Sequence, residues 1–141
     1  DYVISLMPQD GCTLSFGNGS NSYCVMGSTG NNGKVYCNML QEVYVGKNVI
    51  SIGYSAFNSC YSLASITIPN GVTYIRYSAF SNCQGMRYYD FSACTAIPAL
   101  SNKNAFSNIP SDCQMLIPSA LYNNWKSATN WATYASKMVS V

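Results

Sequence analysis

The residues of this chain that could carry chemistry begin with five carboxylates. They are Asp1, Asp10, Glu42, Asp90 and Asp112. Glycoside hydrolysis needs two such groups about 5–10 Å apart. Glu42 and Asp90 are the pair that an exposed sheet face could bring to roughly 10 Å, two strand spacings apart. Because an open face does not exclude water, we predict no catalytic residues, and two carboxylates alone would hold calcium weakly.

Seven cysteines and the absence of histidine limit nucleophilic and metal chemistry. Without histidine there is no Ser–His or Cys–His catalysis and no His-ligated metal. The sequence has no Cys-x-x-Cys pair and no Gly-rich phosphate-binding motif. We therefore predict no metal site, no cofactor and no enzymatic activity. Cys12 and Cys24 lie symmetrically about Asn18, so a disulfide between them and two free thiols are both open.

A low charge content separates the chain from several classes of partner. Only 9% of its 141 residues are charged and the net charge is +2, whereas about 25% is usual. Nucleic-acid binding needs clustered basic residues, and a membrane helix needs an apolar run of roughly 18 residues; the sequence has neither. Tyr, Ser, Asn and Gly take the place of charge, and these types are also enriched in antibody paratopes.

A 23-residue repeat organises the elements that must position these residues. Residues 49–60 (VISIGYSAFNSC) and 72–83 (VTYIRYSAFSNC) share seven identities in twelve positions. Residues 63–68 alternate apolar and polar side chains as a strand does, and residues 69–71 form a turn. The Ala-Phe segment of each copy suits a single turn of helix. Because so short a unit cannot bury its own apolar side, the copies must stack, with strands about 4.8 Å apart in a parallel sheet.

Equivalent side chains should then form ladders inside the stack. The predicted ladders are Leu40/Leu63/Met86, Phe57/Phe80 and Cys37/Cys60/Cys83. The equal spacing of the three cysteines indicates repeated buried positions rather than a disulfide framework. Three stacked thiols without a fourth ligand would also make a poor metal site.

The motif A-F-x-x-C-x-x-L-x-x-I-x-I-P, found in residues 56–69, resembles the BspA-like (Treponema pallidum-type) leucine-rich repeat family. The resemblance is tight over residues 37–91. An irregular unit follows in residues 95–118, with Ala105 and Phe106 in the Ala-Phe position and Cys113 off the cysteine ladder. The resemblance implies an α/β fold class: a short leucine-rich-repeat solenoid with one parallel strand per repeat, short helical turns on the other side and a C-terminal helical cap.

The two ends of the chain depart from the repeat, and the implied division is an N-terminal cap (1–36), repeats (37–118) and a C-terminal cap (119–141). Residues 13–16 and 23–26 read as the strands of a β-hairpin, although the segment could be the remnant of an earlier repeat. Pro118 and Ser119 are suited to begin a helix. Trp125 and Trp131 are predicted to seal the end of the stack, before a final strand near Met138.

The polar positions of the predicted strands define a candidate binding face. These positions are Glu42, Tyr44, Ser65, Thr67, Tyr88 and Asp90. Stacking aligns them in two rows across the strands, in which tyrosines give contact area and acids give specificity. A solvated sheet face without a ligand is the alternative. Tyr54 and Tyr77, which repeat on the outer turn, are expected to serve packing.

The resemblance implies a non-catalytic recognition or adhesion module, extracellular or on a cell surface. Its expected partner is a protein or glycan on a host or neighbouring cell. No nucleic acid and no membrane insertion are expected, and the chain should be a monomer or a weak dimer paired edge to edge. Two alternatives stay open: a variable display or receptor-binding scaffold of a phage or secreted protein, and an accessory domain of a larger secreted enzyme.

Overall fold

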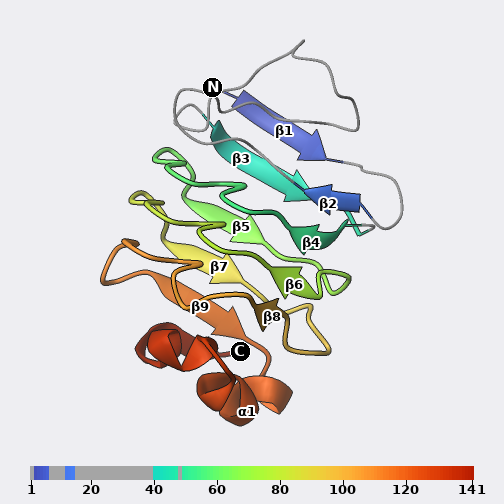
Figure 1. Cartoon of the computed structure of the whole chain (residues 1–141), viewed down its shortest axis with the longest axis vertical. Helices are drawn as coiled ribbons and strands as arrows, with labels where there is room; N and C mark the ends of the chain where they lie inside the picture. Colours follow the sequence, from blue (N-terminus) through green and yellow to red (C-terminus); the bar gives the residue numbers. More distant parts are fainter. Residues whose placement is uncertain (1, 7–11, 15–39, 48) are drawn as a thin grey trace.

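The computed structural model describes residues 2–6, 12–14, 40–47 and 49–141 (Figure 1). The strands are β1 (Tyr2–Leu6), β2 (Cys12–Leu14), β3 (Leu40–Val45), β4 (Val49–Ile52), β5 (Ser65–Thr67), β6 (Tyr74–Ile75), β7 (Tyr88–Asp90), β8 (Ala99–Leu100), β9 (Gln114–Ile117) and β10 (Met138–Ser140). The described helical elements are η3 (Ser119–Leu121), α1 (Tyr122–Ser127) and η4 (Trp131–Lys137). Each strand pairing in this part of the chain is parallel.

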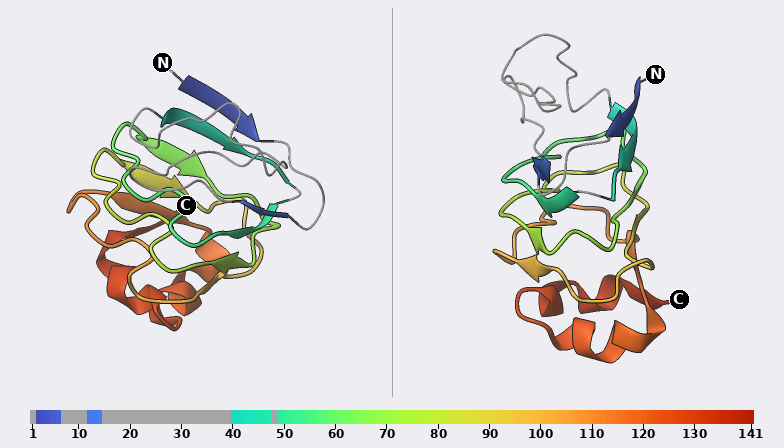
Figure 2. Two further views of the ribbon diagram at one scale, coloured as in Figure 1. Left: turned by 45° about the horizontal axis from the view of Figure 1, so that its top comes forward. Right: turned by 90° about the vertical axis from the view of Figure 1, so that its right-hand side faces the viewer.

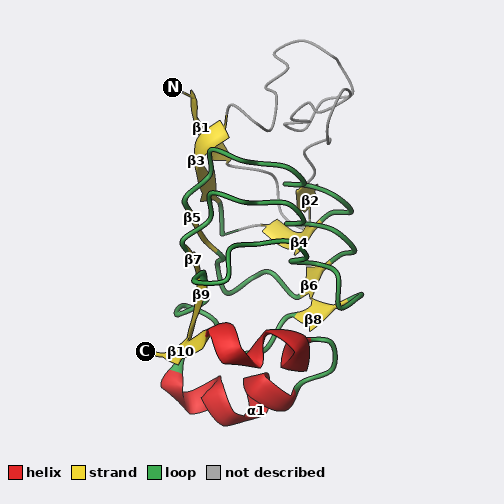
Figure 3. Cartoon of the chain, turned by 90° about the vertical axis from the view of Figure 1, so that its left-hand side faces the viewer, coloured by secondary structure: helices red, strands yellow, loops and turns green. Residues whose placement is uncertain are grey.

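The strands form two columns that face each other (Figure 3). β5, β7, β9 and β10 are hydrogen-bonded neighbours in one column, where the β1–β3 pair lies next to β5. β2, β4, β6 and β8 make up the other. The layers rise one above the next toward the N-terminal end (Figure 2). Ser65 pairs with Tyr88 and Ser51 with Tyr74, so neighbouring layers here differ by one 23-residue unit.

The second column is the main feature that the sequence interpretation missed. One strand per repeat was predicted, but β4, β6 and β8 give each of their units a second strand. These strands arise from the V-x-x-I part of the repeat, where Ile52 pairs with Ile75 and Ile75 with Leu100. A segment of two to four residues is too short for alternation to be visible, so its β structure depends on the neighbouring layer.

The Ala-Phe segments form turns, and the short helical turns predicted for them are not present in the described copies. Their amides bond to the adjacent layer: Phe57 N donates to Ala79 O at 2.7 Å, and Phe80 N donates to Ala105 O at 2.8 Å. Ser55 and Ser78, at the start of each turn, have φ of 53° and 57°. Because left-handed residues interrupt a helix and the amides bond between layers, a helical turn cannot form.

Aromatic rings fill the space between the two columns. Phe57, Phe80 and Phe106 stack at 5.2 and 5.3 Å between ring centroids, and Tyr89 meets Phe80 edge-on at 5.1 Å. The predicted interior positions are confirmed as buried for Leu63, Met86, Phe57, Phe80, Cys60 and Cys83. Cys37 and the side chain of Leu40 lie outside the described residues. Cys113, predicted to lie off the cysteine ladder, is buried as well.

The C-terminal segment packs its tryptophans under the last layers. Trp125 and Trp131 are 0% and 1% exposed and both contact Phe91, with centroid distances of 5.3 and 5.4 Å. Trp131 Nε1 donates to the carbonyl oxygen of Pro98 at 2.7 Å. The chain then returns as β10, which pairs with β9, so the predicted final strand is confirmed from Met138.

The described N-terminal strands continue the two columns. β1 pairs with β3 and β2 pairs with β4, both in parallel. The predicted hairpin extends into residues 15–39, and its return strand (23–26) lies outside the described residues. The possible disulfide between Cys12 and Cys24 depends on side chains that also lie outside them.

Candidate functional site

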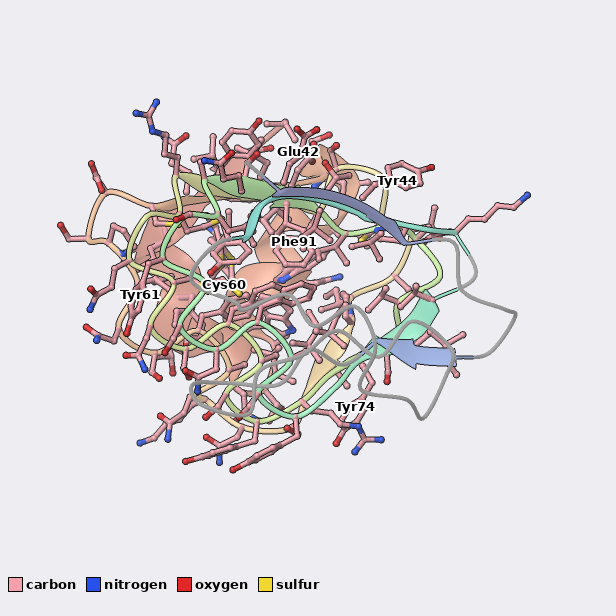
Figure 4. The ribbon with its side chains drawn as sticks, turned by 90° about the horizontal axis from the view of Figure 1, so that it is seen from above. Glu42, Tyr44, Cys60, Tyr61, Tyr74 and Phe91 are labelled. Carbon is pink, nitrogen blue, oxygen red and sulfur yellow. The ribbon has the colours of Figure 1, made fainter. Side chains whose placement is uncertain are left out.

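Side chains of β3, β5 and β7 alternate between the core and an open face. Val43, Ile66 and Tyr89 point inward and are buried. The outward positions carry the predicted site residues. Of these, Glu42, Tyr44, Thr67 and Tyr88 are exposed, and Ser65 and Asp90 are partly exposed. Figure 4 shows Glu42 and Tyr44 projecting from the outer side of the strand layer. We call the six outward residues the strand face.

The residues of the strand face line up in two rows that run across the strands. Ser65 lies beside Tyr88 and Thr67 beside Asp90 in the register of β5 and β7. Tyr44 on β3 and Tyr88 on β7 lie in different rows, two strand spacings apart across the sheet and two residues apart along it, or roughly 12 Å in all. Their side chains are 59% and 40% exposed, so both rings can be covered by an extended ligand that crosses the strands.

Asp90 has a structural task in addition to its place on the strand face. Its Oδ1 accepts a hydrogen bond from the amide of Ser92 at 2.8 Å, which fixes the turn after β7. Burial and, to a smaller extent, the Asp90 charge together raise the pKa of the Cys94 thiol to about 11. One carboxylate oxygen of Asp90 is therefore committed to the protein itself. The Asp-x-Ser spacing of residues 90–92 is the sequence feature from which this turn could have been predicted.

β9 extends both rows of the strand face with two residues that the sequence interpretation missed. Gln114 lies beside Tyr88, and Leu116 lies beside Asp90. Gln114 is exposed and Leu116 partly so. The step from β7 to β9 is 26 residues rather than 23, because Tyr88 pairs with Gln114. An alignment at a fixed 23-residue step therefore could not find these positions.

Thiols and phenols in the interior lie in surroundings that favour their neutral forms. Burial raises the pKa of the Cys113 thiol to about 11. The pKa of Tyr89 is well above its ordinary value, mainly through burial and secondarily through Cys83 and Cys113. A protonated thiol is a poor nucleophile and a poor metal ligand. No group of three His, Cys, Asp or Glu side chains suited to a metal ion occurs among the described residues.

Tyr54 and Tyr77 form an exposed pair on the turn side. Their rings stack at 5.4 Å with an interplanar angle of 11°, and they are 62% and 39% exposed. The predicted packing role is confirmed to this extent, because each ring covers a face of the other. The tyrosines of the strand face are not paired with each other in this way.

Comparison with known protein families identifies a match. The family model described as BspA type leucine rich repeat region, with six copies, matches residues 30–137. A search of curated proteins finds no match. In the described part of the chain, no helix has the length and apolar character needed to span a membrane.

Proposed function

Because the chain belongs to the BspA-type leucine-rich repeat family, we propose that it is a non-catalytic recognition module that binds a protein or glycan through the strand face. In this proposal the stacked layers are a short solenoid, and the C-terminal helical segment caps it. The family is consistent with protein interaction or adhesion. We place the module outside the cell or on a cell surface.

The observation that carries the proposal is the exposure of Tyr44 and Tyr88 on a rigid sheet. Exposed aromatic side chains bury a large area on binding and lose little conformational entropy, since only two side-chain torsions become fixed. The neighbouring Glu42, Ser65 and Thr67 supply hydrogen-bonding groups at fixed spacings. Extended faces of this kind are the binding surfaces of repeat proteins.

The test is a binding screen of the protein against extracellular-matrix proteins and a glycan array. The double variant Tyr44→Ala/Tyr88→Ala is measured beside the unchanged protein. If both rings are central contacts, their loss costs about 2 kcal/mol or more, which weakens binding roughly thirtyfold.

Tyr54→Ala/Tyr77→Ala is the matched control, because it removes two exposed tyrosines from the turn side. Circular dichroism establishes that both double variants remain folded. Equal affinity of the strand-face variant and the unchanged protein would contradict the proposal. So would a screen in which the unchanged protein binds nothing.

A further inference from the structure

A hollow of about 330 Å³ lies at the C-terminal end of the structure, away from the strand face. It forms where the loop between β8 and β9 meets η4, in the helical region at the foot of Figure 3. Its polar lining includes Lys103, Asn104, Asn108, Thr133, Tyr134 and Lys137. Ligand pockets usually measure about 300–1,000 Å³, so this one suits a small molecule.

Two lysines line the hollow, and the protein positions both of them. Lys137 Nζ donates to the carbonyl oxygens of Pro110 and Ser111 at 3.0 and 3.2 Å. An ammonium has three N–H donors, so these two bonds do not use the third. The backbone carbonyl of Lys103 accepts a hydrogen bond from the Tyr134 hydroxyl, which fixes the base of the second lysine. The Lys103 side chain itself is exposed.

The charge of the hollow is not neutralised by nearby residues. No carboxylate lines it, and within the described ranges neither Lys103 nor Lys137 forms an ion pair. Asp112, the acid nearest in sequence to Ser111, is exposed and lies outside the lining. An anion held between the two lysines would gain charge-assisted hydrogen bonds.

The remaining polar lining is uncharged and suits hydroxyl groups. Asn104 and Asn108 contribute amides and Thr133 a hydroxyl. The Asn108 amide nitrogen donates to Asn82 Oδ1 at 2.7 Å, which holds the group in place and leaves its oxygen as an acceptor. A bare oxyanion would use the lysines alone and make no bond to these groups.

We propose that the hollow binds a carboxylate-bearing monosaccharide. The carboxylate lies between Lys103 and Lys137, and the sugar hydroxyls bond to Asn104, Asn108 and Thr133. This site shares no residue with the strand face, so it does not depend on the function proposed for that face.

The test is an amide chemical-shift titration of the isotope-labelled protein with glucuronate, with glucose and sulfate as comparison ligands. We expect glucuronate to shift the amides of residues 103–109 and 133–137, and glucose to shift them much less. Lys103→Gln should raise the Kd for glucuronate up to about fivefold, the upper end for one exposed ion pair. Added salt should weaken binding in the same direction.

Lys126→Gln is the matched control, because it removes the same charge from a lysine that lies over the Tyr122 ring and outside the hollow. Its Kd should equal that of the unchanged protein, as should the Kd of Tyr44→Ala/Tyr88→Ala. The proposal is wrong if glucuronate shifts no amide of the hollow, or if Lys103→Gln binds it unchanged. Sulfate binding as tight as that of glucuronate would also overturn it, since a simple anion site would then be sufficient.

Discussion

Phe80→Ala should destabilise this protein severely, because Phe80 is the middle ring of the aromatic stack. Its ring lies 5.2 Å from Phe57 and 5.3 Å from Phe106, with interplanar angles of 7° and 3°. Tyr89 meets it edge-on at 5.1 Å, and the side chain is 0% exposed. The substitution therefore opens a cavity that touches three layers at once.

The expected loss of unfolding free energy is about 4–5 kcal/mol. Replacing a buried phenylalanine with alanine costs about 3–5 kcal/mol, depending on how far the site can collapse. Collapse is restricted here, because the Phe57 amide donates to the carbonyl oxygen of Ala79 in the next layer and the Phe106 amide donates to the Tyr134 hydroxyl. Aromatic contacts add about 0.5–1.5 kcal/mol each, which places Phe80 at the upper end of that range. This is a large share of the 5–15 kcal/mol typical of a whole domain.

Urea unfolding followed by circular dichroism measures the loss, with the slope m as a check on two-state behaviour. Tyr77→Ala serves as the control, because it breaks an aromatic stack of similar geometry at 39% exposure and should cost about 1 kcal/mol. A loss below about 2 kcal/mol for Phe80→Ala would refute the reasoning. Equal losses for the two variants would refute it as well.

Three further changes test other parts of the structure. Gly85→Ala places a Cβ 2.3 Å from the carbonyl oxygen of Tyr61, so the two layers must separate. Urea unfolding should show a loss of about 1–3 kcal/mol of unfolding free energy. Unchanged stability would contradict this close approach. Trp131→Phe leaves the buried carbonyl of Pro98 without its donor and should cost at least about 1–3 kcal/mol in the same assay; a neutral result would disprove the anchoring role. Cys113 has a native pKa raised from 9.0 to about 11, so its contribution to stability is complete below pH 9 and is lost as the pH rises toward 11, since the unfolded thiol ionises first. Urea midpoints measured across this range should fall for the unchanged protein more steeply than for Cys113→Ala, and equal slopes would rule the effect out.

The strands of the first column could be predicted because one copy alternates clearly and the repeat carries its pattern to the next. Ile66 between Ser65 and Thr67 assigns the inward and outward directions, and the 23-residue register transfers them to Tyr89 between Tyr88 and Asp90. Residues 49–52 and 74–75 lack this signal, since a strand of two to four residues has hardly one period. Their β structure comes from hydrogen bonds to the next layer, which a single repeat does not contain.

The strand face and the hollow also differ in how far the sequence predicts them. Residues of the strand face follow one another at a constant step, so they could be named from the sequence as far as Asp90. Gln114 and Leu116 were missed because the outward positions of the irregular last unit, although that unit was predicted, were not added to the face. The hollow joins Lys103 with Lys137, which belong to different elements and to no repeat. Only the packing of η4 against the loop before β9 brings them together.

Because the layers repeat along the sequence, the length of the strand face depends on the number of repeat units that the gene encodes. Among the described residues, hydrogen bonds between strands join neighbouring layers, as in the pairing of Ser65 with Tyr88 and of Tyr88 with Gln114. A gene that gains or loses one whole unit would therefore insert or remove a layer without changing either end. The number of copies would then set the length of the strand face.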